Sequence, residues 1–342
     1  MTKKIALSGY YGFDNFGDEC ILGILIQNLK SLGLDTDITA FSSKPEITSK
    51  RYDVKSIKTF DLLGIMNVLE KSDVLVSGGG SLLQDATSLK SLLYYLWVIS
   101  MALFYKKKVL IFAQGIGPIN NKFAQLLTKN ILKKASYLSV RDEKSLFLLR
   151  GWGLDPMLVA DPVWNLELSE RTPKGRIGVQ LRQWKTLTDE YILSLAKNVA
   201  KNYPDKEVYI YSFQDSQDYE VCKKFQNYLS LANKDIKSMI IYQRSNQEII
   251  DSFRNLDALI AMRYHACLLA IKYGIPTLPI SYDQKVEKLA KELEMDYLTL
   301  DQRMRIAEAV EDLKKLNMTY IKEKVQSKRF DFAPVLEVIN KD

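Results

Sequence analysis

The sequence is poor in the residues that build metal centres and disulfide frameworks. Its 342 residues include one histidine and three cysteines. The cysteines, Cys20, Cys222 and Cys267, are odd in number, far apart and outside any C-x-x-C pair, so they offer neither a disulfide framework nor a zinc site. We therefore expect no metal and no bound cofactor, and we expect a reducing, intracellular compartment.

Segments that would cross a membrane or direct secretion are also lacking. The longest apolar run, 92–105, has about 14 residues, whereas a spanning helix needs about 20. The chain enters a strand and a glycine loop almost at once, which leaves no room for a signal peptide. These features favour a cytoplasmic protein.

Charge of one sign is only in mild excess. The chain has 48 lysines and arginines against 41 acidic residues, which gives a net charge of +7. The basic residues are scattered and no basic stripe is interleaved with aromatic residues, so the composition does not indicate a nucleic-acid-binding protein. The excess favours anionic substrates or an acidic membrane surface.

Apolar segments typical of strands alternate with segments of helical periodicity along most of the chain. Strands are predicted at 4–8, 37–41, 73–76, 109–113 and 137–140, and again at 176–181, 207–212, 239–242, 258–261 and 276–280. The first helix is predicted to be capped by Gly33, and a long apolar helix to cover 82–105. This alternation predicts an α/β fold with doubly wound parallel sheets.

The alternation lapses at 160–175, where prolines and turn formers replace it. We therefore predict two Rossmann-like domains, 1–165 and 176–305, which face each other across a central cleft. The remaining segment, 306–342, is charged and helical in pattern without a strand, and we expect it to be a tail that packs across the body.

Glycine-rich loops follow three of the predicted strands of the first domain. The first loop has glycines at 9, 12 and 17, which match neither G-x-G-x-x-G nor a Walker loop, so an NAD site is not indicated. That loop carries Tyr10 and Tyr11, whose rings suit stacking on a sugar. The triple glycine at 78–80 would let a ligand approach the backbone closely. Ligands of open parallel sheets bind at this carboxyl edge.

The second domain places Arg263 and His265, the only histidine of the chain, between a predicted strand and a predicted helix. A cation beside the free N–H groups of a helix start is suited to bind an anion. An imidazole in that position can move a proton near neutral pH. The alternative is a turn with a structural histidine.

Six short motifs follow one another along the chain. They are Gly9-Tyr-Tyr-Gly-Phe-x-Asn-x-Gly-Asp-Glu19, Ser77-Gly-Gly-Gly-Ser-Leu-Leu-Gln-Asp85, Ala113-Gln-Gly-Ile-Gly-Pro118, Ser139-Val-Arg-Asp142, Met262-Arg-Tyr-His-Ala266 and Ser281-Tyr-Asp-x-Lys285. Together and in this order they resemble the polysaccharide pyruvyl transferase family, most of all its bacterial cell-wall CsaB type. The resemblance runs from about Ile5 to Lys288. One residue departs from it, because Gln284 stands where such members usually have proline.

The resemblance implies a GT-B-like fold and a particular reaction. The donor would be phosphoenolpyruvate and the acceptor a sugar residue, joined as a pyruvyl ketal across two hydroxyls with release of phosphate. For the CsaB type, the acceptor is N-acetylmannosamine of a secondary cell-wall polymer, presented on a lipid-linked precursor. A peripheral contact with the inner face of the membrane would be consistent with such an acceptor. The oligomeric state stays open.

Arginines would have to hold the donor, because it carries about three negative charges near pH 7 and no metal site is offered. We expect Arg263 to be the first clamp. We rank Arg141 slightly above Arg182 as the second, because Arg141 belongs to a matched motif; a structural salt bridge is the alternative for both. His265 would be a general acid or base, or a phosphate ligand. Asp18 would activate the acceptor, with Glu19 and Asp85 as further candidates and helix capping as the alternative.

Further substrate-binding residues are expected in the same motifs. They are Gly78, Gly79 and Gly80, which would admit sugar or phosphate to the backbone; Tyr10 and Tyr11, which would stack on the acceptor; Asn15, Glu19 and Gln114; and Asp283 and Lys285 on the donor side. Two other functions stay open. One is a GT-B glycosyltransferase or epimerase with a nucleotide-sugar donor, and the other is a sugar-binding protein without catalysis.

Overall fold

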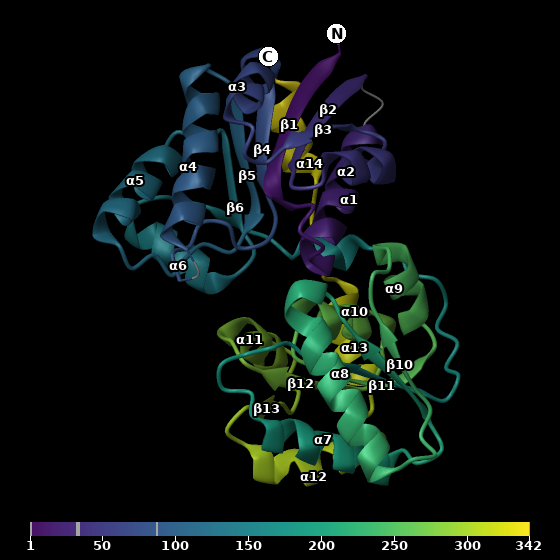
Figure 1. Cartoon of the computed structure of the whole chain (residues 1–342). Coiled ribbons are helices and arrows are strands. Elements are labelled where there is room, and N and C mark those ends of the chain that lie inside the picture. Colours follow the sequence, from purple (N-terminus) through teal and green to yellow (C-terminus); the bar gives the residue numbers. More distant parts are fainter. Residues whose placement is uncertain (1, 32–34, 87, 342) are drawn as a thin grey trace. The chain divides into compact units, whose positions relative to one another are not determined.

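A computed structural model describes residues 2–31, 35–86 and 88–341 of the chain. The chain forms two compact units, of which the first comprises Met1–Leu166 and Arg329–Asp342 and the second Glu167–Lys328 (Figure 1). The segment predicted as one C-terminal tail, 306–342, is therefore divided between the units. The predicted cap at Gly33 lies outside the described residues.

The first unit is built on a seven-stranded parallel sheet. Its strand order is β3-β2-β1-β4-β5-β6-β7. The strands are β1 (Lys3–Tyr11), β2 (Thr36–Ser42), β3 (Lys55–Lys58), β4 (Val74–Gly78), β5 (Lys108–Gln114), β6 (Tyr137–Val140) and β7 (Met157–Leu158). The order reverses between β1 and β4, and doubly wound sheets bind ligands at such a switch point.

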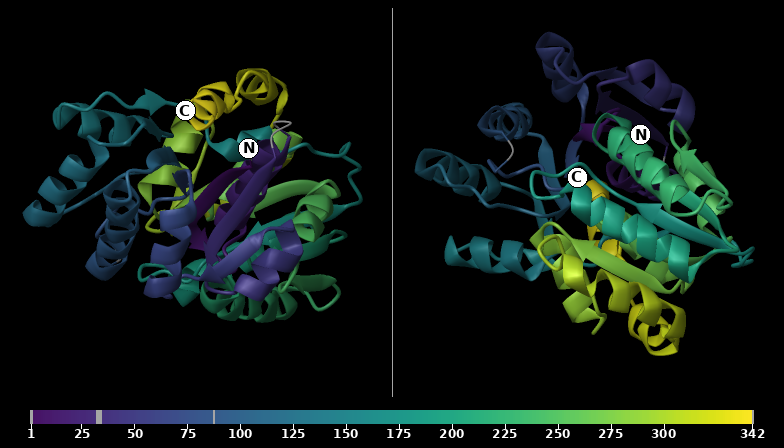
Figure 2. Two further views of the ribbon diagram at one scale, coloured as in Figure 1. Left: turned by 90° about the horizontal axis from the view of Figure 1, so that it is seen from above. Right: turned by 60° about the horizontal axis from the view of Figure 1, so that its bottom comes forward.

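Helices cover both faces of this sheet. They are α1 (Phe16–Lys30), α2 (Pro45–Tyr52), α3 (Leu62–Lys71), α4 (Leu89–Phe104), α5 (Lys122–Leu132), α6 (Glu143–Gly151), the 3-10 helix η1 (Pro162–Asn165) and α14 (Ala333–Asn340). Helices α3 to α6 bury apolar side chains in one cluster with the strands, so they share one face of the sheet. Helices α1 and α2 lie on the opposite face, as Figures 1 and 2 show.

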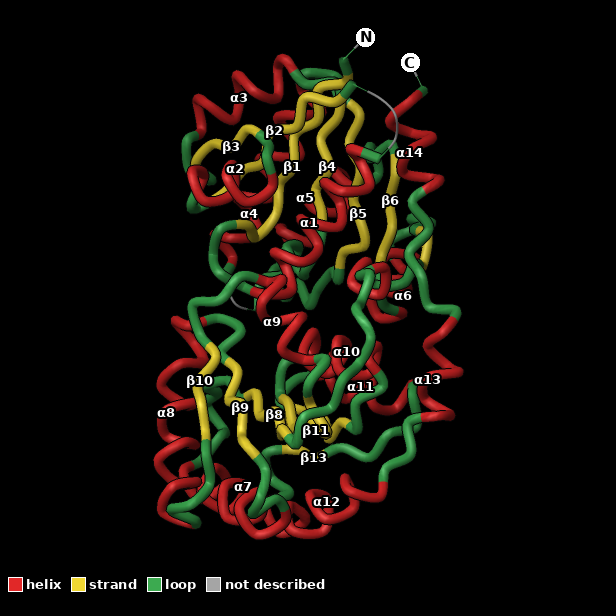
Figure 3. Tube along the Cα trace, turned by 90° about the vertical axis from the view of Figure 1, so that its right-hand side faces the viewer, coloured by secondary structure: helices red, strands yellow, loops and turns green. Residues whose placement is uncertain are grey.

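The second unit repeats this arrangement with six parallel strands in the order β10-β9-β8-β11-β12-β13 (Figure 3). The strands are β8 (Arg176–Gln180), β9 (Glu207–Tyr211), β10 (Ser238–Ile241), β11 (Leu256–Ala261), β12 (Thr277–Ser281) and β13 (Leu298–Thr299). The helices are α7 (Asp189–Asn202), α8 (Asp215–Ala232), α9 (Asn246–Phe253), α10 (Tyr264–Tyr273), α11 (Gln284–Glu292), α12 (Ile306–Asp312) and α13 (Thr319–Gln326), with 3-10 helices η2 (Arg303–Arg305) and η3 (Leu313–Lys315). The prediction of two α/β, Rossmann-like domains is confirmed.

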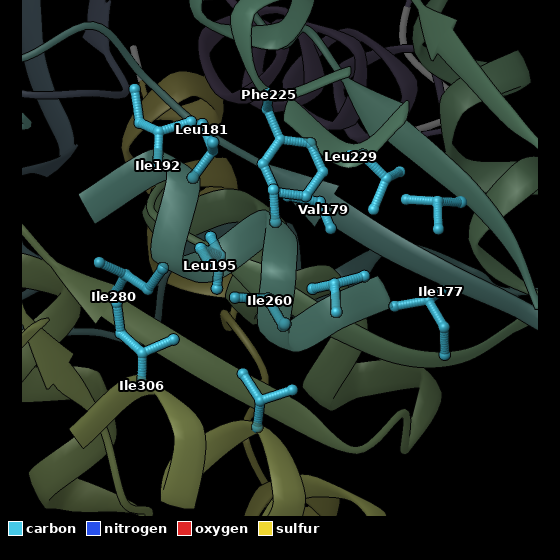
Figure 4. Packing of buried hydrophobic residues seen from close by; sticks show 14 of the residues in the cluster. Ile177, Val179, Leu181, Ile192, Leu195, Phe225, Leu229, Ile260, Ile280 and Ile306 are labelled. Atoms are coloured by element: carbon cyan, nitrogen blue, oxygen red, sulfur yellow. The ribbon is translucent and has the colours of Figure 1, made fainter. Parts of the chain in front are cut away.

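β-Branched strand residues build the core of the second unit. Ile177, Val179 and Ile260 are fully buried against Leu195 of α7 and other helix residues (Figure 4). Strands buried on both faces are typically rich in such residues. Ile306 of α12 lies in the same cluster, so the beginning of the predicted tail is part of this core.

Two further segments differ from the sequence prediction. The long apolar helix was predicted from residue 82, but α4 begins only at Leu89, where the Ser88 hydroxyl accepts a hydrogen bond from the Ser91 backbone N–H at 3.3 Å and caps the helix. Helix α2 and strand β3 were missed because 45–58 is mostly polar and has no clear apolar period. Within the described part of the chain, no helix is both long and apolar enough to cross a membrane.

Candidate functional site

The predicted Arg263–His265 turn lies at the carboxyl edge of the second sheet. Strand β11 ends at Ala261, and α10 begins at Tyr264, with Arg263 in an extended backbone conformation at the N-cap. The backbone N–H of Arg263 donates to the Gln180 side-chain oxygen at 2.8 Å, which ties the turn to the end of the neighbouring strand β8. His265 is the second residue of α10, and its ring meets the Tyr264 ring edge-on with centroids 5.0 Å apart.

The Arg263 side chain forms a buried, bidentate ion pair with Asp218 of α8. Its Nε donates to one carboxylate oxygen at 2.7 Å and its Nη2 to the other at 2.6 Å, while Nη2 also reaches the Gln214 side-chain oxygen at 3.3 Å. Asp218 is fully buried. Its burial raises its pKa, against the effect of the guanidinium and of hydrogen bonds from the Phe213 and Gln214 backbone N–H groups.

This pair changes what Arg263 can offer to a substrate. The sequence predicted Arg263 as the first clamp on the donor, but its Nε and Nη2 atoms bind Asp218. Among the described residues, the hydrogen bonds of the guanidinium use Nε and Nη2 and none uses Nη1, so Nη1 is the atom that a ligand would contact. The fixed orientation of this group is the preorganisation that anion binding requires.

A second arginine, Arg182, stands at the same edge just after β8. Its Nη1 donates to the Tyr282 hydroxyl at 3.0 Å, and its guanidinium lies 5.4 Å from the Trp184 ring centre and 5.3 Å from that of Tyr282. Its Nε is buried and has no hydrogen-bond partner among the described residues. Burial raises the pKa of Tyr282 and Asp283 adds to the rise, whereas the charges of Arg182 and Arg263 oppose it.

The predicted donor-side loop is the start of α11. Asp283 is the N-cap of this helix and accepts hydrogen bonds from the backbone N–H groups of Lys285 at 3.0 Å and Val286 at 3.3 Å. Its carboxylate therefore caps a helix, and its role as a ligand stays a prediction. Lys285 is exposed. Gln284 is the first residue of α11, a position that favours proline. Glutamine also fits there, so replacement of the usual proline leaves the start of the helix intact.

At the carboxyl edge of the first sheet, Asp18 lies in the first turn of α1 with only 7% of its surface exposed. Its carboxylate accepts a hydrogen bond from the Asn15 side chain at 2.5 Å. A Cβ atom on Gly80 would come within 2.3 Å of Asp18, and Gly80 has a φ of +65°, so only glycine fits there. The role of Asp18 as a base stays a prediction, and so does a ligand role for Asn15.

Two other predicted residues of this edge are structural. Glu19 accepts hydrogen bonds from the Gly12 backbone N–H at 2.7 Å and the Tyr52 hydroxyl at 2.9 Å, and it pairs with Arg51 at 3.3 Å. Tyr11 is fully buried and its hydroxyl donates to the Gly78 carbonyl at 2.9 Å. Burial and the nearby carboxylates raise the pKa of this tyrosine. The prediction of Tyr11 as a stacking surface is thus corrected.

Tyr10 differs from Tyr11 because its side chain is only half-buried. Its ring stacks on Phe13 with centroids 4.2 Å apart and an interplanar angle of 6°. One face of the Tyr10 ring is therefore occupied by protein, and its stacking on an acceptor stays a prediction for the other face.

The triple glycine is packed by protein and does not form an open cradle. All three residues are buried, and a Cβ atom on Gly79 would lie 2.6 Å from Ile21. The Gly79 backbone N–H donates to the Phe112 carbonyl at 3.1 Å, and the Gly80 carbonyl accepts from the Gly115 N–H at 3.0 Å. These glycines allow close packing between α1 and the sheet, which corrects their prediction as a ligand-admitting loop.

Gln114 is fully buried, and its side-chain N–H group donates to the Ser77 carbonyl at 2.8 Å and hydroxyl at 2.9 Å. Its Oε1 atom and the Ser81 hydroxyl are buried without a hydrogen-bond partner in the described parts of the chain. Buried polar atoms without partners are costly, so these two atoms are candidates for ligand contact. The sequence predicted Gln114 as a ligand but missed Ser81.

Arg141 forms an ion pair with Asp161 at 2.5 Å, and both side chains are more than nine-tenths buried. Asp161 also accepts a hydrogen bond from the Val163 N–H at 3.0 Å and caps η1. The ion pair with Asp161 agrees with the alternative of a structural salt bridge for Arg141. Arg182, by contrast, lies at the same sheet edge as Arg263. The signal for Asp161 was the Asp-Pro pair, which is typical of a helix start.

The sequence also missed Asp218, Gln180 and Gln214, which orient Arg263. Their positions could have been noticed in the sequence, because Gln180 ends an apolar strand segment and Gln214 comes just after one. Among the residues that the structure describes, no group of three or more His, Cys, Asp or Glu side chains is arranged to hold a metal ion.

Comparison with known proteins identifies both the family and the fold. The sequence model of the family described as polysaccharide pyruvyl transferase matches residues 15–284. No curated protein sequence gives a significant match.

Solved structures of similar fold include two epimerases. A putative UDP-N-acetylglucosamine 2-epimerase from Listeria monocytogenes is 10% identical with a TM-score of 0.68, over 99% of this chain and 96% of that one. UDP-GlcNAc 2-epimerase from Methanocaldococcus jannaschii is 14% identical with a TM-score of 0.65, over 95% and 99%. Anabaena HepE, in complex with UDP and glucose, is 10% identical with a TM-score of 0.61, over 98% and 97%. These likenesses show a GT-B-like fold.

Proposed function

The chain belongs to the polysaccharide pyruvyl transferase family, and we propose that it transfers the pyruvyl group of phosphoenolpyruvate to a sugar residue, with release of phosphate. The observation that carries the proposal is the carboxyl edge of the second sheet. Arg182 follows β8, and Arg263 and His265 follow the neighbouring strand β11. Asp218 holds the guanidinium of Arg263. A donor with a carboxylate and a phosphate requires such fixed cationic groups.

The proposed donor contacts follow from the atoms that the protein leaves available. The Nη1 atom of Arg263 and the Nε atom of Arg182 are the guanidinium nitrogens that would donate hydrogen bonds to the carboxylate and the phosphate. The N–H groups in the first turn of α10 add favourable dipoles for an anion. Arg141 would contribute less to donor binding, because its charge is already paired with that of Asp161.

The proposed reaction balances without a redox partner or a cofactor. The methylene carbon of phosphoenolpyruvate gains a proton, and a first sugar hydroxyl forms a C–O bond to the central carbon. The bond to the phosphate then breaks, and a second hydroxyl bonds to the same carbon to close the ketal. The two hydroxyl groups release two protons. One of them restores the acid that protonated the methylene carbon, and the other is carried away on the released phosphate.

Two side chains are proposed to move these protons. His265 would donate to the methylene carbon or to the leaving phosphate, because an imidazole can both give and accept a proton. Asp18 would accept a hydroxyl proton on the acceptor side, near the unpartnered atoms of Gln114 and Ser81 at the same sheet edge. We propose N-acetylmannosamine on a lipid-linked precursor as the acceptor and the cytoplasm as the compartment, on the resemblance to the CsaB type.

Mass spectrometry of a lipid-linked N-acetylmannosamine glycan, incubated with the protein and phosphoenolpyruvate, tests the proposal. We expect the added mass of a pyruvyl ketal and an equal amount of phosphate, with turnover unaffected by a chelator. The same incubation with a UDP-sugar in place of phosphoenolpyruvate is the control. It tests the nucleotide-sugar alternative, which the similarity to the UDP-GlcNAc 2-epimerases and HepE favours. Glycosyl transfer or epimerisation, without a ketal, would replace the proposal.

A further inference from the structure

The outward face of α4 is largely apolar, with Ser100 as the polar residue in its stripe. Leu89, Leu93, Trp97 and Phe104 recur on one side of this helix, with Leu93 39% and Phe104 72% exposed. The opposite side is buried in the core of the first unit. A surface helix normally turns a charged or polar face to water, so the outward face of α4 needs another explanation.

Helix α5 extends this apolar surface. It contacts α4 and packs on the same face of the sheet (Figure 2). Phe123 and Leu126, which lie one turn apart on α5, are 71% and 57% exposed. We call the surface formed by Leu89, Leu93, Trp97, Phe104, Phe123 and Leu126 the α4–α5 face. Exposed apolar residues gathered on neighbouring helices are the kind of surface that marks an interaction site on a folded protein.

The charges on α4, on α5 and on the segment between them are all basic, and Asp85, which accepts hydrogen bonds from Asn120 and Asn121 at the start of α5, is the acidic residue that adjoins them. The segment 86–141 contains eight lysines, one arginine and no acidic residue. Lys90, Lys106, Lys122, Lys133 and Lys134 are exposed and form no ion pair within the described residues. Basic residues around an apolar helical face are the pattern that binds anionic lipid surfaces.

We propose that the α4–α5 face docks on an anionic phospholipid bilayer. Helix α4 has 16 residues, or about 24 Å, and one side of it is committed to the sheet, so it would lie in the plane of the interface and not span the bilayer. A second copy of this chain is a poorer occupant. An isologous dimer would set the same lysines of two copies against one another. This proposal does not depend on the reaction proposed above.

Cosedimentation of the full chain with vesicles tests the proposal. The two vesicle types are phosphatidylcholine alone and phosphatidylcholine mixed with an equal part of phosphatidylglycerol. We expect partition onto the anionic vesicles only, weakened by salt. The triple variant Phe104→Ser/Phe123→Ser/Leu126→Ser should lower the partition coefficient at least about tenfold. Its matched control, Leu231→Ser/Met239→Ser/Met304→Ser, changes exposed apolar residues of the second unit and should bind as the wild type does.

A charge-reversal pair separates lipid attraction from apolar contact. Lys122→Glu/Lys133→Glu/Lys134→Glu should reduce binding to the anionic vesicles about 100-fold or more. Lys197→Glu/Lys201→Glu/Lys234→Glu changes the net charge equally, on exposed lysines of the second unit, and should reduce it far less. Equal losses in both variants, or no binding by the wild type, would overturn the proposal. So would a dimer in light scattering that the serine variant of the α4–α5 face abolishes.

Discussion

The carboxyl edges of β1 and β4 in the first unit and of β8 and β11 in the second occupy the same place in two sheets of the same strand order. At the first edge, Tyr11 and Glu19 bond to neighbouring protein groups, and the glycines fit against buried side chains. At the second edge, Arg263 and Arg182 are held by Asp218 and Tyr282 and keep nitrogen atoms for a ligand.

The strand order determines where a binding site can lie, but the side chains at that edge determine which ligand it can bind. Both edges lie where doubly wound sheets bind ligands. At the first edge, motif residues such as Tyr11 and Glu19 hold the start of α1 in place. At the second edge, Asp218 and Gln214 orient the guanidinium of Arg263. Loss of Tyr11 or Glu19 should therefore reduce stability at the first edge, whereas loss of His265 or Arg182 should reduce turnover or donor binding at the second.

The largest effect should come from His265→Ala. Removal of a proton carrier typically lowers turnover by about 10²–10⁴-fold. The melting temperature should change little, because His265 is partly exposed at a helix start. Phosphate release in the presence of both substrates measures the loss, and near-normal turnover would remove His265 from the chemistry.

Asp218→Ala should damage both stability and donor binding. It leaves the Arg263 charge buried without its partner, which typically costs about 3–5 kcal/mol. The double variant Arg263→Met/Asp218→Asn removes both charges and keeps an acceptor for the Phe213 N–H. It should unfold later in urea than Asp218→Ala and still bind phosphoenolpyruvate poorly. Recovery of donor binding in the double variant would show that the pair serves the fold alone.

Glu19→Ala tests the first edge. It leaves the Gly12 N–H and the Tyr52 hydroxyl without their acceptor, so the free energy of unfolding should fall by about 2–4 kcal/mol. The turnover number of the folded fraction should stay close to the wild-type value. Tyr52→Phe, which removes one of these bonds, should cost about 1 kcal/mol. A selective fall in turnover with unchanged stability would reassign Glu19 to the site.

The smallest effect concerns Asp85, whose carboxylate accepts hydrogen bonds from the Asn120 and Asn121 N–H groups at 2.7 and 2.8 Å. Slight desolvation raises the pKa of Asp85, but these hydrogen bonds outweigh it and lower the pKa below its ordinary value of 3.8. Their contribution is therefore present above pH 3.8 and is lost as the pH falls through the lowered value. Asp85→Ala should destabilise by about 1 kcal/mol at pH 7 and by less at pH 3. An equal difference at both pH values would contradict the linkage.

The sequence predicted the two Rossmann-like domains because the strands are apolar runs separated by helical periods. It also located the Arg263–His265 turn, since a strand and a helix flank it. It did not predict that Asp218, a residue of a helix far away in sequence, takes the bidentate edge of Arg263. Similarly, Tyr11 and the triple glycine match ligand-loop patterns, but their burial depends on Ile21 and on the neighbouring strands, which only the fold brings together.

Calorimetric titration of the protein with phosphoenolpyruvate tests whether the second edge binds the donor through Arg182 and Arg263. We predict that the wild type binds phosphoenolpyruvate and that Arg182→Ala raises its Kd at least about tenfold, since one charge-assisted contact is worth more than 1.4 kcal/mol. Arg141→Lys, which keeps a charge opposite Asp161, should bind nearly as the wild type does. Unchanged affinity in Arg182→Ala together with lost affinity in Arg141→Lys would show that the donor binds at Arg141 and not at the second edge.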